Sequence, residues 1–137
     1  MAVGQAEVHP LRILVAEDEA LAAMVIEEVL TDLGHAVTLA ADGQAALEVA
    51  RCGRFDVLIT DLAMPRLPGW ELIRRLRARQ PDLPVVVMTG YLPPSVGTVL
   101  FADDSGPLAV LMKPFDISAL TAALARVSPV TCAAGTG

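Results

Sequence analysis

The stretch FDVLITDLAMP, from Phe55 to Pro65, decides the fold class. Its first six residues are mostly apolar and include β-branched side chains, which is typical of a buried strand, and Asp61 follows where that strand should end. Pro65 and Gly69 then mark a loop before the next helical pattern. A short apolar strand, a loop that carries an acid and a helix together form the repeating unit of a parallel α/β sheet.

Four further apolar runs resemble the one from Phe55 to Thr60. They are Arg12 to Ala16, Ala36 to Leu39, Pro84 to Thr89 and Leu108 to Met112. Helical patterns separate the runs, so the sequence predicts five strands joined by βαβ units. Because most runs are too uniformly apolar to have a face in solvent, we expect helices on both faces of a parallel sheet.

The first and last helices are predicted from apolar residues at spacings of three and four. The first ends at Gly34, and its expected buried face is Ala22, Val25, Val29 and Leu33. The last begins after Asp116, a favourable N-cap, and its expected buried face is Ile117, Leu120, Leu124 and Val127.

The middle helices are predicted from their caps and breakers. Asp42-Gly43 caps a helix over Gln44 to Arg51, and a third helix, carried by Trp70 and Ile73 among others, ends before Pro81. A weaker fourth helix follows Pro93-Pro94. Five arginines are expected to form a solvated face, with a partner-docking patch as the alternative: Arg66, Arg74, Arg75, Arg77 and Arg79.

The composition limits the kind of protein. The chain has 137 residues, 54% of them hydrophobic, and a net charge of −6, with Lys113 its one lysine. This favours one domain over 11–128, between a flexible lead (1–10) and tail (129–137). The acidic balance argues against direct nucleic-acid binding, and no apolar run is long enough to span a membrane. Cys52 and Cys132 lack a metal-binding spacing, so a reduced, cytoplasmic protein is expected.

Chemically active side chains follow four of the predicted strands. The first strand leads into Glu17-Asp18-Glu19, the third into Asp61, and the fourth ends at Thr89, while Lys113 follows the fifth. Because the carboxyl ends of parallel strands meet at one edge, we expect these groups to share a pocket. Carboxylates in such proximity repel one another, which predicts a hard divalent cation, Mg²⁺ or Mn²⁺, among them.

Four motifs stand at these strand ends in order. They are LVAED (Leu14 to Asp18), TDLAMP (Thr60 to Pro65) with Gly69 after it, VVVMTG (Val85 to Gly90) and MKPF (Met112 to Phe115). Together they resemble response-regulator receiver domains of two-component signal transduction, over about Leu11 to Val127. The resemblance implies a single doubly wound, flavodoxin-like (βα)5 domain with a parallel sheet in the order 2-1-3-4-5.

The resemblance also implies a role for each site residue. Asp61 would accept a phosphoryl group, which Thr89 and Lys113 would contact, and the Lys113-Pro114 bond would be cis. The implied metal ligands are Glu17, Asp18, Asp61 and the backbone carbonyl of Ala63. The protein would catalyse only its own phosphorylation and dephosphorylation. The donor would be a histidine kinase or phosphotransfer protein that docks near Ala20 to Ile26. The resemblance does not indicate which downstream protein is the target. A monomer or weak dimer is expected.

The sequence departs from the family pattern at the switch. Most receivers carry an aromatic residue three positions before the lysine, where this chain has Val110, and Tyr91 is the nearest aromatic candidate to replace it. Tyr91 and Ala63 also occupy the positions that control water access to the phosphoryl group, which predicts slow self-dephosphorylation.

Val110 supports an alternative function, an interaction module that is never phosphorylated. A phosphohydrolase is disfavoured because residue 63 is alanine, and flavin binding because the first loop is acidic.

Overall fold

The fold is a five-stranded parallel sheet in the order β2-β1-β3-β4-β5, and the computed structural model describes residues 10–90 and 106–128. The strands are β1 (Arg12–Ala16), β2 (Ala36–Ala40), β3 (Val57–Asp61), β4 (Val85–Thr89) and β5 (Leu108–Met112). The predicted strand order is confirmed, and each predicted strand lies within two residues of the observed one. Both edges of the sheet, β2 and β5, have partly exposed side chains, whereas β3 and β4 are buried throughout.

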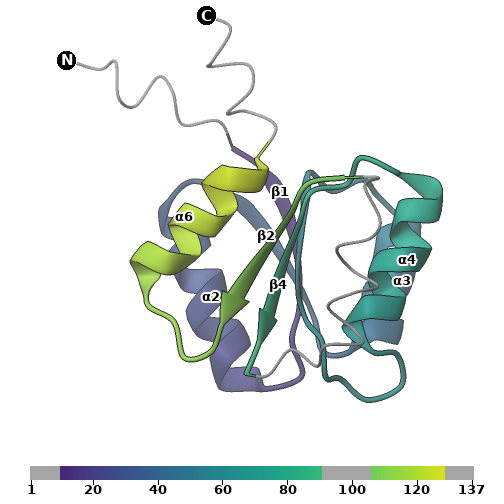
Figure 1. The fold of residues 1–137 in the computed structure, drawn as a ribbon, viewed down its shortest axis with the longest axis horizontal. Coiled ribbons are helices and arrows are strands. Elements are labelled where there is room, and N and C mark those ends of the chain that lie inside the picture. The colour runs from purple at the N-terminus through teal and green to yellow at the C-terminus, as the bar shows by residue number, and fades with distance from the viewer. Residues whose placement is uncertain (1–9, 91–105, 129–137) are drawn as a thin grey trace, which may run out of the picture.

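Helices cover both faces of the sheet, as expected (Figure 1). The helices α2 (Ala20–Asp32) and α6 (Ile117–Val127) lie on one face, and α3 (Gly43–Arg51) and α4 (Gly69–Arg79) lie on the other. Each face has its own apolar core, because alternate strand residues such as Ile13 and Leu14 point to opposite sides. The expected fourth helix lies outside the described residues. Within the described ranges, no helix has the length and apolar character needed to cross a membrane.

The buried face of α2 differs from the prediction. Its buried residues are Ala23, Ile26 and Leu30, whereas Val25 is 59% exposed and Leu33 40% exposed. Of the predicted face, Val29 still packs against the core, but since one residue turns a helix by about 100°, Val25 and Leu33 point away from the sheet. The first seven residues of α2 are all apolar, so the spacing of apolar residues is compatible with two different buried faces. Packing against β1 and β3 selects the one that contains Ile26 and Leu30.

Two other predicted faces need correction. Ile117 is 59% exposed because it is the first residue of α6, while the other three predicted residues of that helix are buried. Arg77 is buried instead of solvated. Its guanidinium donates hydrogen bonds to the carbonyl oxygens of Leu83 (3.0 and 3.2 Å) and Pro107, so it joins α4 to the segments that precede β4 and β5.

The loop after β3 is held tightly beneath the end of that strand. The Gly69 N–H donates to the Leu62 carbonyl at 2.8 Å, and a side chain at Gly69 would overlap the Asp61 carbonyl oxygen. A side chain at Gly43 would likewise overlap the Leu67 carbonyl oxygen. Asp42 caps α3 by accepting a hydrogen bond from the Ala45 N–H at 2.8 Å, as predicted. These close contacts fix the position of Asp61.

Candidate functional site

Four of the predicted site residues lie together where the parallel strands end, at the carboxyl-terminal side of the sheet. Glu17 follows β1, Asp61 ends β3, Thr89 ends β4 and Lys113 follows β5. The register places Asp61 beside Met88, and Thr89 beside the last residue of β5. Glu17, Asp61 and Thr89 are 2%, 8% and 3% exposed, so a polar cluster is buried at the carboxyl end of an otherwise apolar sheet. Tyr91 lies outside the described residues.

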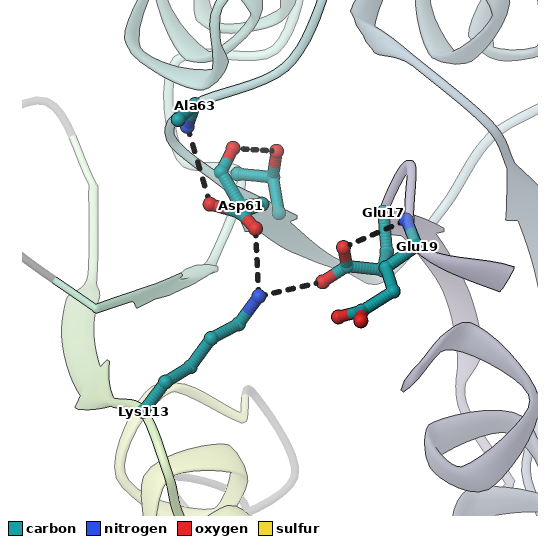
Figure 2. Close-up of polar contacts among 6 residues, drawn as sticks. Glu17, Glu19, Asp61, Ala63 and Lys113 are labelled. Carbon is teal, nitrogen blue, oxygen red and sulfur yellow. Dashed lines mark hydrogen bonds and ion pairs between the residues drawn. The ribbon is translucent and has the colours of Figure 1, made fainter. Parts of the chain in front are cut away.

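Lys113 bridges two of the acids. Its Nζ lies 2.7 Å from Asp61 Oδ2 and 3.0 Å from Glu17 Oε1 (Figure 2). Burial favours the neutral amine, but the hydrogen bonds to Asp61 and Glu17 and the negative charges of both outweigh it. The pKa of Lys113 therefore lies above its usual value. Lys113 is thus a charged ammonium at neutral pH, with both carboxylates within its reach.

The other oxygens of these acids accept backbone hydrogen bonds. Glu17 Oε2 accepts from the Glu19 N–H at 3.0 Å, and Asp61 Oδ1 accepts from the Ala63 N–H at 3.1 Å (Figure 2). Asp61 is therefore also a local loop cap. The Thr60 hydroxyl donates to the Asp61 carbonyl at 2.8 Å. Sequence reasoning gave Thr60 no separate role, because a threonine in a strand carries no signal of such a contact.

The acids could hold a hard divalent cation. One oxygen from each of Glu17, Asp18 and Asp61 lies within 4.8 Å of the others, with Asp18 exposed. The donors are all oxygens, which suits Mg²⁺ or Mn²⁺. Lys113 offsets one of the three negative charges, so the cluster keeps a net negative charge that favours a cation. The donor set therefore fits the metal that the sequence predicts.

Lys113 and Val110 lie on or beside β5 as predicted. The Lys113-Pro114 bond is cis, as the resemblance implied, and the Lys113 N–H donates to the Thr89 carbonyl at 2.8 Å. Val110 is half-buried, pairs with Val87 and packs against the core on the side of α3 and α4. Ala63 is exposed on the loop beyond Asp61.

This arrangement, a parallel sheet with an acidic cluster at its strand ends, agrees with the family that the sequence matches. The sequence matches the response regulator receiver domain family over residues 13–125. The chain therefore belongs to this family, whose members act in two-component signal transduction.

Known relatives and structures agree with this assignment. The chain is 36% identical to the transcriptional regulatory protein PdtaR of Mycobacterium tuberculosis, covering 92% of this chain and 62% of PdtaR. It is 37% identical to the response regulator MprA of Mycolicibacterium vanbaalenii, in an alignment that covers 82% of this chain and 48% of MprA. The chain thus spans about half to three fifths of the length of these relatives.

Two solved structures share the fold closely. Chemotaxis protein CheY4 of Vibrio cholerae aligns with a TM-score of 0.79 and 30% identity, covering 87% of this chain and 99% of that one. The receiver domain of sensor histidine kinase PA1611 from Pseudomonas aeruginosa aligns with a TM-score of 0.75 and 32% identity. The alignment covers 87% of this chain and 98% of that domain. That structure has a magnesium ion coordinated in its active site cleft.

Proposed function

We propose that Asp61 accepts a phosphoryl group from a phosphohistidine of a histidine kinase or phosphotransfer protein. The observation that carries the proposal is the buried Asp61 carboxylate, paired with Lys113 and adjacent to Glu17 and Asp18. A nucleophilic carboxylate, a mobile ammonium and a cation-binding cluster are the parts that phosphoryl transfer to an acid requires.

In this step an Asp61 oxygen attacks the phosphorus in line. A P–O bond forms to Asp61 while the P–N bond to the donor histidine breaks, and the leaving imidazole keeps the electron pair and takes up a proton. Lys113 moves from the free carboxylate to a phosphoryl oxygen, and the Thr89 hydroxyl donates to another. The product is an aspartyl phosphate at the end of β3.

The metal ligands in this proposal are Glu17, Asp18, Asp61 and the Ala63 carbonyl. When bound, Mg²⁺ neutralises charge on the transferring phosphoryl oxygens. Glu17 and Asp61 are already oriented for this role by the Glu19 and Ala63 N–H groups.

The donor docks, in this proposal, on the exposed apolar surface of α2. Leu21, Met24 and Val25 are 74%, 58% and 59% exposed, and α2 begins directly after the acidic loop of the site. A partner seated on this surface would therefore lie beside Asp18, close to the acidic cluster that contains Asp61. The corrected orientation of α2 supports the docking expectation, because it turns these side chains outward.

Mass measurement after incubation with acetyl phosphate and Mg²⁺ tests the phosphoryl acceptor. The wild type should gain the mass of one phosphoryl group, Asp61→Asn should gain none, and Asp82→Asn, at an exposed acid outside the site, should behave as the wild type. Phosphorylation of the Asp61→Asn protein to the wild-type extent would refute the assignment.

Val110 supports a second candidate, a binding module that works without phosphorylation. A valine cannot perform the aromatic rotamer change that the family uses as a switch. If the wild type gains no phosphoryl group from acetyl phosphate or from a phosphohistidine donor, the unphosphorylated module becomes the better description.

A further inference from the structure

A pocket lies between α3, α4 and the sheet, at the opposite end of β3 from Asp61. It has a volume of about 230 Å³. Leu58, near the start of β3, and Phe55, in the preceding loop, form part of its wall. Leu76 on α4 and Gln80, which directly follows α4, line the opposite side. The proposed phosphorylation site therefore does not use this pocket.

The floor of the pocket is apolar and belongs to the core. Leu14, Leu58 and Leu83 line it and are 1%, 0% and 3% exposed. Apolar cavities of about 150 Å³ in other proteins accept a benzene molecule. A pocket of about 230 Å³ therefore has room for a substituted benzene ring, but not for an extended peptide segment.

Cations, and no carboxylate, line the rim. Arg54 and Arg79 both contribute to the pocket and are exposed. Among the described residues neither has an ion-pair partner, whereas the neighbouring Arg74 and Arg75 on α4 both pair with Glu71. The remaining polar side chain, Gln80, donates to the Phe55 carbonyl at 3.4 Å. The rim thus offers two guanidinium groups above an apolar floor, in a chain whose overall charge is negative.

We propose that this pocket binds a small carboxylate whose apolar body has about the size of a substituted benzene ring. The ring would rest on the three leucines, and the carboxylate would lie at the rim between Arg54 and Arg79. Guanidinium groups match the planar carboxylate, since each can donate two parallel hydrogen bonds. The charge of the rim selects an anion over a neutral molecule of the same shape.

Titration with benzoate, followed by amide chemical shifts in NMR spectra, tests this proposal. Benzoate should shift the amides of Ala50, Gly53, Phe55 and Gln80 in a saturable manner. Benzyl alcohol, which lacks the charge, should bind at least about threefold more weakly, and acetate, which lacks the ring, should not saturate these shifts. The measurement needs neither Mg²⁺ nor a phosphoryl donor, so its result is independent of the chemistry at Asp61.

Substitutions test separately how the rim arginines and the space inside the pocket contribute to benzoate binding. Arg54→Gln and Arg79→Gln should each weaken benzoate binding about threefold, while Arg126→Gln, on α6 across the sheet, should leave it unchanged. Ala50→Phe should fill the pocket and abolish binding, with circular dichroism as the check on folding. Ala50→Leu is the milder filling variant and should weaken binding.

Three results would overturn the proposal. The first is equal affinity for benzyl alcohol and benzoate. The second is unchanged benzoate binding when Arg54→Gln and Arg79→Gln are combined in one protein, and the third is undiminished benzoate binding by a folded Ala50→Phe protein. Binding of an acidic, phenylalanine-containing peptide at this site, with no binding of benzoate, would also overturn it and would assign the pocket to a protein partner.

Discussion

His35 links the stability of the fold to pH because it is partly buried. Its Nδ1 accepts from the Leu11 N–H at 3.0 Å, which requires the neutral imidazole at that nitrogen. Burial lowers the pKa of His35 below its usual value of 6.5. The unfolded chain therefore binds this proton more readily than the folded chain does, so the contribution of His35 is complete above about pH 6.5 and is lost as the pH falls through the folded pKa.

We expect the wild type to lose more stability than His35→Gln when the pH falls from 7.5 to 5.5. Urea unfolding of both proteins at the two pH values measures this difference, and the carboxylates common to both proteins cancel in it. Glutamine retains an acceptor for the Leu11 N–H but does not titrate. Equal losses in the two proteins would show that His35 is not linked to folding.

Arg66 has a backbone conformation that favours glycine. Its φ is 72°, and its side chain is 73% exposed and 3.6 Å from Asp42, a weak ion pair. Arg66→Gly should raise the free energy of unfolding by about 1 kcal/mol in chemical denaturation, because the strain exceeds the lost ion pair. Arg74→Gly, inside α4, should lower it by about 1 kcal/mol. A destabilised Arg66→Gly protein would contradict this reasoning.

At the scale of elements, α2 shows which of two apolar stripes the sheet selects. Ile26→Ala should cost about 2–4 kcal/mol of unfolding free energy, because Ile26 packs between the helix and the sheet. Val25→Ala should change it by less than about 0.5 kcal/mol, since Val25 lies at the surface. Chemical denaturation of the two variants compares them directly. If both substitutions lowered the free energy of unfolding by similar amounts, α2 would have to be rotated differently about its axis.

The elements differ in how far the sequence determines them. The strands and the caps Asp42 and Asp116 were predictable, because apolar runs and capping residues act within a few positions. The rotation of α2 and the burial of Arg77 were not, since both depend on residues far away in the sequence. Arg77 bonds to Pro107, thirty residues on, and no local pattern signals that contact.

The site followed from topology more than from local pattern. Glu17, Asp61 and Lys113 are far apart in the sequence, yet the parallel order places their strand ends together. What topology does not give is the pairing among them. That Lys113 contacts both Glu17 and Asp61 depends on side-chain conformations that only the packed structure defines.

At the scale of the whole molecule, cation binding should stabilise the fold. A ligand that binds the folded chain alone adds about 2.7 kcal/mol when present at a hundred times its Kd. Mg²⁺ should therefore raise the thermal midpoint, and Asp18→Asn should reduce that shift, because Asp18 belongs to the acidic cluster. Glu28→Gln, on the exposed part of α2, should leave it unchanged. Loss of the shift in both variants would indicate nonspecific screening.

Two of the described helices, α2 and α4 on opposite faces of the sheet, carry opposite charge. Among the residues of α2 there are three acids and no cation, whereas α4 has four arginines and one glutamate, and the sheet separates them (Figure 1). The charges of these two helices therefore contribute an electric dipole directed across the sheet. In the field of a charged partner such a dipole experiences a torque, so the domain is turned before the surfaces touch. A partner with a basic surface would meet the α2 side first, and this orientation would weaken as salt is added.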